Sequence, residues 1–449
     1  MVNATNMSTS RGTPRSWFAV VAIWASLSAL SAAHAASFSV TNSADDPDTA
    51  PGDGVCATLR GVCTLRAAMQ EANALPGTDT ISLPSGTYRL KAGELAVTDD
   101  LILTGAGPDN TIISNIHKAR VMSIASTATV TIAGVRLQNG RADIGAGLLN
   151  DGSATLSNVS FTGNYASRSA GGWGGGINNT GTLTLSNATF ARNRAFGAMA
   201  GFGGGIYNTG TAMLTDVIFT NNFTNGCGGA IFNDIGALTL TRATVSGNHA
   251  SNSGAGVFVQ TGSAALSETT FSLNRAKIIG GAFYTNAPAT LTNTTITNNR
   301  SQYGAGLFND RHAVVTLTNL TISSNTARFG GGLYSNSSST MLRNTLIAFD
   351  HPDNCQGTGA GVTSLGHNLD SGATCGLAAT GDLSNINPQL ATLSNNGGPT
   401  KTCALLLTSP AVDAGDNTGC PATDQRGAPR PAGDPSAPIC DIGAYELQP

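Results

Sequence analysis

The chain has 449 residues, of which only 11% are charged, and its formal net charge is −3. This composition predicts that no basic surface is available for phosphate groups, and it argues against nucleic acid as a partner. The 56 glycines are compatible with low-complexity disorder, but 40% of the residues are hydrophobic. Because these hydrophobic residues recur in register, an ordered repeat protein is favoured.

The first 35 residues have the features of a secretory signal peptide. Arg11 and Arg15 precede an apolar run at residues 17–30, and the small residues SAAHAAS follow it. This pattern predicts cleavage between Ala35 and Ala36. The alternative is a single membrane anchor, which needs about 20 apolar residues. We therefore predict an exported protein whose mature chain has no membrane span.

The segment TLRAAMQEANAL, residues 64–75, predicts a short amphipathic helix with Thr64 as its N-cap. Residues 80–140 then predict two or three irregular β-coils. The apolar face of the predicted helix consists of Leu65, Ala68, Met69 and Ala72.

A glycine-rich hexapeptide recurs from residue 145 onward, every 24–29 residues. Alternating segments such as TLTLSNATFARN follow it, in which Leu183 and Leu185 lie two residues apart, the period of a strand. Three short strands per repeat, joined by Gly and Asn turns, predict an all-β fold, a right-handed parallel β-helix. Leucine-rich repeats share the period, but they need a helical segment in each repeat. The hexapeptides are GAGLLN (145), GGGINN (174), GGGIYN (203), GGAIFN (228), GAGVFV (254), GGAFYT (280), GAGLFN (304) and GGGLYS (330).

An Asn residue ends the alternating segment of each repeat. Stacked coils of a solenoid are spaced by ~4.8 Å, so equivalent residues form ladders along its axis. An inward Asn at a corner pairs with the coils above and below and satisfies buried turn groups. The alternative is a row of binding-site asparagines. The predicted structural ladder consists of Asn164, Asn193, Asn222, Asn248, Asn274, Asn299 and Asn325, with Asp350 in the last repeat.

An aromatic residue follows the aliphatic residue of the hexapeptide in six consecutive repeats. If Ile206, Ile231 and Leu333 point inward, strand alternation sends these rings outward as a stripe that suits stacking on sugars or peptides. Alternatively, the parity is reversed and the rings lie in the core, or the C-terminal region covers them. The candidate ligand-binding stripe consists of Tyr207, Phe232, Phe258, Tyr284, Phe308 and Tyr334. The residues predicted to point into the interior before the hexapeptides are Trp173, Phe202, Tyr303 and Phe329.

Candidate catalytic carboxylates are sparse in the repeats. Asp151, Asp234 and Asp310 recur at one place in their coils. Each lies three coils from the next, ~14 Å at the strand spacing, which exceeds the roughly 5–10 Å of a glycosidase pair. Asp216 and Glu268 are predicted to be isolated.

Other catalytic or metal-binding motifs are absent from the sequence. It has no Asp-rich calcium repeat, no His-Glu-x-x-His helix and no Gly-x-Ser-x-Gly elbow. His249, His312 and His351 are predicted to be solvated corner residues. The sequence thus predicts no catalytic residue, no cofactor and no metal.

The end of the chain, from about residue 351, is rich in Pro, Gly and Cys and predicts an irregular cap that closes the second end of the solenoid. Cys227 and Cys403 are left as thiols or as a long-range pair, and spacing alone does not fix the connectivity. Disulfides persist in exported proteins. The predicted pairs are Cys56–Cys63, Cys355–Cys375 and Cys420–Cys440.

Three stretches resemble known families. The motif GGAI (228–231), together with FTGN, FARN, FTNN and FSLN, resembles the repeat of the polymorphic outer membrane proteins. Residues 52–90 resemble the CSLREA domain, which is named after a sequence motif, and this chain has CTLRAA at the position of that motif. The tail, with NPQLATLSNNGGPTKTCALLLTSPAVDAGD and CDIGAYE, is similar to the choice-of-anchor Q domain. These resemblances imply an exported or surface-displayed bacterial protein of pectate-lyase-like fold, and none implies an established activity.

The predicted organisation is a signal peptide (1–35), a CSLREA-like cap (36–90), a β-helix (91–350) and a choice-of-anchor Q-like region (351–449). We expect a secreted or cell-surface protein with a non-catalytic role, either adhesin-like binding or surface display. Association with the outer membrane is one option for its location. The expected partner is a glycan or a host or environmental surface. The alternatives are a polysaccharide lyase or glycoside hydrolase on the same fold, and a purely structural envelope protein.

Overall fold

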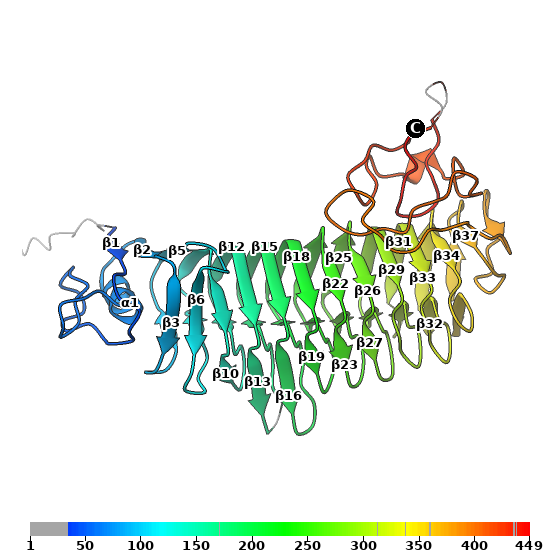
Figure 1. Ribbon diagram of the computed structural model, residues 1–449. Coiled ribbons are helices and arrows are strands. Elements are labelled where there is room, and N and C mark those ends of the chain that lie inside the picture. Colours follow the sequence, from blue (N-terminus) through cyan, green and yellow to red (C-terminus); the bar gives the residue numbers. More distant parts are fainter. Residues whose placement is uncertain are drawn as a thin grey trace, which may run out of the picture.

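The computed structural model describes residues 35–169, 171–311, 313–336, 338–358, 361–433, 436 and 438–449. The predicted signal peptide lies outside these residues, apart from Ala35, and so does His312. The described chain forms an elongated parallel β-helix (Figure 1), as the repeat pattern predicted. Every pairing between its named strands is parallel, with equivalent residues of successive coils in register, as in Ile177 beside Ile206.

The long sheet forms two sides of the solenoid. In its longest strands a left-handed residue such as Asn187 (φ 50°) bends the chain midway, so that one strand contributes to both sides. Its strands are β1 (Ser37–Ser39), β2 (Asp79–Leu83), β3 (Gly86–Leu90), β5 (Leu101–Gly105), β6 (Thr111–Asn115), β8 (Thr129–Ala133), β9 (Arg136–Gln138), β12 (Ser153–Thr162), β15 (Thr182–Ala191), β18 (Thr211–Thr220), β21 (Ala237–Thr241), β22 (Thr244–Ser246), β25 (Ser263–Ser267), β26 (Thr270–Ser272), β29 (Ala289–Thr297), β31 (Val314–Ser323), β33 (Ser339–Arg343), β34 (Leu346–Ala348), β36 (Val362–Ser364), β37 (Leu369–Asp370) and β38 (Leu383–Ser384).

Two further sheets complete the coils. The short sheet follows the Asn ladder and consists of β10 (Arg141–Ala142), β13 (Tyr165–Arg168), β16 (Arg194–Gly197), β19 (Phe223–Thr224), β23 (His249–Ala250) and β27 (Arg275–Ala276). The aromatic sheet follows the glycine-rich corner and consists of β4 (Leu95–Val97), β7 (Met122–Ile124), β11 (Leu148–Asn150), β14 (Ile177–Asn179), β17 (Ile206–Asn208), β20 (Ile231–Asn233), β24 (Val257–Val259), β28 (Phe283–Thr285), β30 (Leu307–Asn309), β32 (Leu333–Asn336) and β35 (Cys355–Thr358).

Coils also form outside residues 91–350, the range predicted for the β-helix. At the N-terminal end, β2 and β3 pair with β5 and β6. At the other end, β35, β36 and β37 pair with β32, β33 and β34. The predicted caps therefore contribute strands of their own to the solenoid.

The helix α1 (Leu65–Ala74) confirms the predicted capping helix. The side chain of its N-cap, Thr64, accepts a hydrogen bond from the backbone N–H of Ala67, which satisfies one of the amide groups left unpaired at a helix start. All residues of the predicted apolar face are buried. The helix packs against β2 and β4 at the N-terminal end of the solenoid (Figure 1). No helix within the described residues is long and apolar enough to cross a membrane.

The Asn ladder is internal, as predicted. The side-chain carbonyl of Asn274 accepts hydrogen bonds from the backbone N–H and the side-chain amide of Asn248, both 3.0 Å long. The Asn248 amide also donates to the backbone carbonyl of Phe219. The ladder ends on Asp350, whose carboxylate accepts both bonds from Asn325. Burial raises the pKa of Asp350 well above its ordinary value.

Replacement of Asn248 by Ala is expected to lower the free energy of unfolding by about 1–3 kcal/mol, because it leaves buried groups of both neighbouring coils unpaired. Thermal denaturation followed by circular dichroism measures the change. Asn252→Ala, at an exposed position four residues after Asn248, is the control and should stay within about 0.5 kcal/mol of the wild type. Equal stability of the two variants would contradict an internal ladder.

A second Asn ladder, which the sequence analysis did not single out, follows the aromatic sheet. The amide of Asn179 donates to the side-chain carbonyl of Asn208 at 2.7 Å, and Asn208 donates likewise to Asn233 at 2.6 Å. All three residues are fully buried. The central core is mainly aliphatic and includes a short stack of rings, in which the centroids of Phe190 and Phe161 are 4.9 Å apart.

The three predicted disulfides are confirmed, as Cys56–Cys63, Cys355–Cys375 and Cys420–Cys440. Cys227 and Cys403 are free thiols. Cys227 packs in the aromatic cluster beside Ser253, whereas Cys403 lies beside Ser323 of the long sheet. The long-range pair that the sequence left open is therefore not formed.

The C-terminal region differs from the predicted end cap. Residues from about 388 onward return along the solenoid and lie on the long sheet over β26, β29, β31 and β34 (Figure 1). The buried Gln425 accepts a hydrogen bond from Thr295 and donates to Thr270. The disulfide Cys355–Cys375 remains near the end of the solenoid, where β35 forms its last aromatic-sheet strand.

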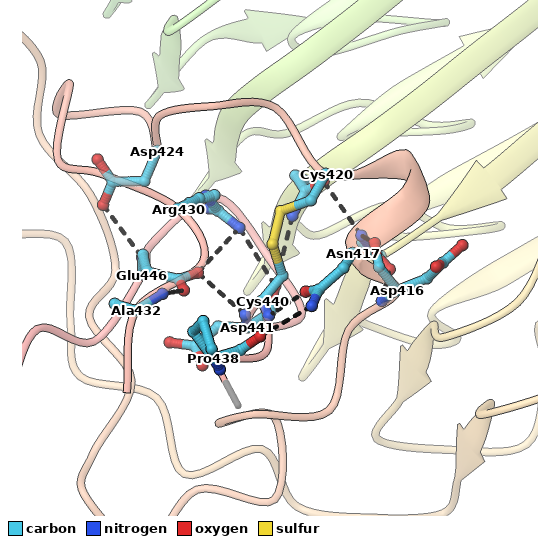
Figure 2. Close-up of a disulfide and its surroundings, with 12 residues drawn as sticks. Asp416, Asn417, Cys420, Asp424, Arg430, Ala432, Pro438, Cys440, Asp441 and Glu446 are labelled. Atoms are coloured by element: carbon cyan, nitrogen blue, oxygen red, sulfur yellow. Dashed lines mark hydrogen bonds and ion pairs between the residues drawn. A yellow bond between two sulfur atoms is a disulfide. The ribbon is translucent and has the colours of Figure 1, made fainter. Parts of the chain in front are cut away.

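A buried ion cluster holds this C-terminal region together (Figure 2). The guanidinium of Arg430 is fully buried, lies 3.3 Å from the Glu446 carboxylate, and donates to the carbonyls of Asp441 and Gly443. Burial raises the pKa of Asp441 to about 7. Asp424 accepts from the backbone N–H of Glu446, so the carboxylates are satisfied mainly by backbone donors.

Candidate functional site: the outer face of the short sheet

The predicted aromatic stripe points outward, but it is not exposed. The aliphatic neighbours Ile206 and Ile231 belong to the central core, while the rings form a separate cluster outside it. The rings stack in sequence, with centroids 4.8 Å apart for Phe232 and Phe258. The exposed fraction is only 9% for Tyr207 and smaller for the next four members of the stripe. The alternation rule therefore gave the correct direction, and the prediction of exposed rings is wrong for these five residues.

A second layer of rings covers the stripe. Trp173 stacks on Tyr207 at 5.4 Å, Phe202 packs against Phe232 at 4.9 Å, and Tyr303 meets Tyr334 edge-on at 6.0 Å. The prediction that these corner residues, and Phe329, point into the interior is wrong, since all four are half-buried. Each precedes a left-handed glycine, so the alternation of a strand does not continue across the corner.

The aspartates predicted at one place in their coils act as partners of the covered rings. The Tyr207 hydroxyl donates to Asp234 at 2.8 Å, and the Tyr284 hydroxyl donates to Asp310 at 3.0 Å. Burial and the nearby carboxylate raise the pKa of Tyr207 above its ordinary value. Asp151 instead accepts from Thr180.

Asp216 and Glu268 are not isolated. Both occupy the left-handed position of the long sheet, with Arg242 between them in the intervening coil. Arg242 donates two hydrogen bonds of 2.7 Å to Asp216, which lowers the pKa of that carboxyl. Glu268 lies against the C-terminal region, where burial raises its pKa. One arginine thus separates the two carboxylates.

The outer face of the short sheet carries the candidate functional site. In each coil the residue that follows the ladder Asn turns outward, while the next residue is buried, as with Arg194 and Ala195. The two-residue strands hold this alternation because the ladder fixes the corner just before them. The outward residues form a row along the solenoid: Arg141, Tyr165, Arg194, Phe223, His249, Arg275, Arg300 and Thr326.

The C-terminal half of this face is a basic groove of about 740 Å³. Arg275 and Arg300 lie on adjacent coils in direct register. Lys277 and Arg328 add two more cations. Each lies two residues after a member of the row and is also exposed. Their exposed side chains have no acidic partner among the described residues. The prediction that the protein lacks a basic surface is therefore wrong, because four of its 23 lysines and arginines line one groove.

His249 and Phe223 continue the row beside the basic groove. Their rings stack at 5.3 Å. Burial and the adjacent Arg275 lower the pKa of His249, which favours the neutral imidazole. His249 is half-buried in the groove wall and is not the fully solvated corner residue that the sequence predicted. It provides a flat surface and a hydrogen-bonding nitrogen next to the cations.

Acidic groups are scarce on this face. Among the described residues of the segments around the row from Arg141 to Thr326, Asp143 is the only acid, and it pairs with Arg168 at 3.8 Å. No group of three or more His, Cys, Asp or Glu side chains that could hold a metal ion occurs in the described chain. The arrangement can therefore bind negative charge through hydrogen bonds and can stack planar rings.

The sequence contained one signal for this row. The dipeptides Asn-Tyr, Asn-Arg, Asn-Phe, Asn-His, Asn-Arg and Asn-Arg recur at the ladder positions from 164 to 300. Reading the residue after each ladder Asn gives the row directly. The total charge does not reveal this row, because a net charge carries no information about position.

Comparisons with known proteins give one family-model match and a small number of similar solved structures. A model described as the Chlamydia polymorphic membrane protein (Chlamydia_PMP) repeat matches residues 216–234. The structure of pectate lyase Pel9A is similar with a TM-score of 0.45 and 13% identity, over 92% of this chain and 98% of that chain. The A-module of the Azotobacter vinelandii mannuronan C-5 epimerase AlgE4 is similar with a TM-score of 0.37 and 17% identity, over 71% and 96% of the two chains. No curated protein matches the chain.

Proposed function

We propose that this protein is a secreted or cell-surface bacterial β-helix that binds an acidic polysaccharide on the outer face of the short sheet. The observation that carries the proposal is the basic groove, whose cations Arg275, Lys277, Arg300 and Arg328 have no acidic partner in the part of the chain that the structure describes. A surface location is supported by the matched repeat of a membrane-protein family. The resemblance of the N-terminal region to the CSLREA domain and of the C-terminal region to the choice-of-anchor Q domain also supports export.

The energetics of the basic groove favour an anionic ligand. Like charges directly opposite each other on neighbouring strands destabilise a sheet, and Arg275 and Arg300 are such a pair. Without a ligand, the repulsion between these two side chains therefore destabilises the sheet at this place. A bound anion removes the repulsion and gains charge-assisted hydrogen bonds, which are about twice as strong as neutral ones.

The geometry favours a polysaccharide over a nucleic acid. The row of outward residues is straight, and its members are spaced by one coil, ~4.8 Å. An extended chain of pyranose rings advances by close to this distance per ring, so charges on successive rings stay near successive coils. The phosphates of duplex DNA follow a helical path with a ~3.4 Å step in each strand, which does not stay in register with the row.

A binding role is supported over glycoside hydrolysis by the groups that line the groove. Glycoside hydrolysis uses a pair of carboxylates on opposite sides of the scissile bond. The groove is lined by cations, by His249 and by small or amide side chains. The hydrolase and lyase alternatives are tested together with binding, by assays for reducing ends and for the absorbance of unsaturated uronates.

The double variant Arg275→Gln with Arg300→Gln is expected to weaken binding of polygalacturonate at least tenfold. Each charged hydrogen bond contributes ~1.5 kcal/mol or more, and every 1.4 kcal/mol corresponds to a factor of ten. Isothermal titration calorimetry at low salt measures the effect, with dextran as the neutral polysaccharide.

The matched control is Arg89→Gln with Lys91→Gln, which removes two exposed cations near the N-terminal end of the solenoid. It should bind polygalacturonate as the wild type does. If the wild type does not bind polygalacturonate, or if both double variants bind it equally, the proposed function is wrong. Release of unsaturated or reducing ends by the wild type would favour an enzyme.

A further inference from the structure

The short sheet carries a second hollow, in its N-terminal half. This hollow has a volume of about 710 Å³. It combines three arginines with three aromatic rings, and the Arg141 guanidinium lies 5.6 Å from the centroid of the Tyr165 ring. Phe196 is 41% exposed, and among the described phenylalanines only Phe349 is exposed to a similar extent. The lining side chains are Arg141, Tyr165, Arg192, Arg194, Phe196 and Phe223.

The second hollow and the basic groove are neighbours on one surface. Phe223 lines the hollow, His249 lines the groove, and these two residues are partners in the register of β19 and β23. Their stacked rings join the two sites, and no other described segment lies between them in the row. Figure 1 shows the strands β13, β16, β19, β23 and β27 following one another along one side of the solenoid.

The dimensions of the face determine the direction of an extended ligand. The strands β19, β23 and β27 have two residues each, so a chain that crossed the sheet would follow it for only ~7 Å. Along the axis, six coil steps separate Arg141 from Arg300, which is ~29 Å at the coil spacing. Only a ligand parallel to the axis reaches cations in both halves.

We propose that the hollow and the basic groove form one track that binds a single linear chain of acidic sugars parallel to the solenoid axis. This inference rests on the proposed function and extends it to the length and orientation of the ligand. In the N-terminal half the sugar rings stack on Phe196 and its neighbours while Arg194 binds a carboxylate. In the C-terminal half Arg275 and Arg300 bind carboxylates of the same chain.

The track predicts a dependence of binding on chain length. A short oligomer occupies either half separately, whereas a long oligomer engages both, and the second contact then forms at a high effective concentration. With α-1,4-linked galacturonate oligomers as probes, we expect two tetramers but one dodecamer to bind per chain. The dodecamer should bind at least tenfold more tightly than the tetramer.

The variant Arg194→Gln with Phe196→Ala tests the N-terminal half. Calorimetry should show one tetramer per chain in place of two, and dodecamer binding at least tenfold weaker than in the wild type. Both side chains are exposed, so the melting temperature should stay unchanged and should exclude misfolding as the cause. Arg89→Gln with Lys91→Gln again serves as the control.

The outcomes separate this inference from the proposed function. If neither oligomer binds the wild type, the proposed function itself fails. Three results would overturn the track and show that the basic groove acts alone. They are equal affinity for the tetramer and the dodecamer, binding of two dodecamers per chain, and unchanged dodecamer binding in the variant Arg194→Gln with Phe196→Ala. Tighter binding of a twelve-residue oligothymidylate than of the dodecamer would also overturn the track, in favour of a single-stranded nucleic acid.

Discussion

The triple variant Phe232→Ser, Phe258→Ser and Tyr284→Ser is expected to yield no folded protein. These rings are at most 6% exposed and stack on one another over three consecutive coils. Truncation of a buried aromatic ring costs roughly 3–5 kcal/mol, so three truncations cost roughly 9–15 kcal/mol, which is comparable to a typical stability of about 5–15 kcal/mol. The yield of soluble exported protein and its thermal denaturation measure the result.

The control for this variant is Phe196→Ser, which truncates a ring that is 41% exposed on the short sheet. It should be exported and should melt close to the wild type. A triple variant with an unchanged melting temperature and weakened glycan binding would instead restore the aromatic stripe as the ligand site. That outcome would contradict the assignment of the stripe to packing.

Replacement of Arg430 by Met is expected to destabilise the C-terminal region selectively. Arg430 is the buried cation that faces Glu446, and Asp441 and Asp424 lie in the same cluster (Figure 2). Removal of one partner from a buried ion pair leaves an uncompensated charge and costs about 3–5 kcal/mol. The region from about residue 388 should then become sensitive to limited proteolysis, while the solenoid coils keep their strand signal in circular dichroism.

The double variant Arg430→Met with Glu446→Gln is the matched control. It removes both charges, and such a change is often close to neutral, so protease resistance should return at least in part. Equal sensitivity of the single and the double variant would show that the lost hydrogen bonds to Asp441 and Gly443, rather than the unpaired carboxylate, determine the stability of this region.

The features that the sequence predicted correctly depend on local or strictly repeated patterns. Leu183 and Leu185 set the strand period, Thr64 and the residues after it defined a capped helix, and each ladder Asn recurred with the coil. The disulfide pairs Cys355–Cys375 and Cys420–Cys440 close short loops, so pairing neighbours in the sequence identified them correctly.

The features that could not be predicted from the sequence depend on positions that only the folded chain brings together. Phe202 and Phe232 belong to different coils, and their contact depends on a left-handed glycine that interrupts the strand alternation. Gln425 and Thr295 are separated by 130 residues, so the return of the C-terminal region along the long sheet has no local signal. The basic face takes one or two residues from each coil, and its charge is balanced elsewhere in the chain.

The most direct test of the central claim is a crystal structure of the mature chain in complex with dodecagalacturonate. We predict that the oligosaccharide lies on the outer face of the short sheet, parallel to the solenoid axis, with carboxylates within hydrogen-bond distance of Arg194, Arg275 and Arg300. An oligosaccharide bound to the long sheet or to the aromatic sheet, or one that crosses the solenoid axis, would contradict this account.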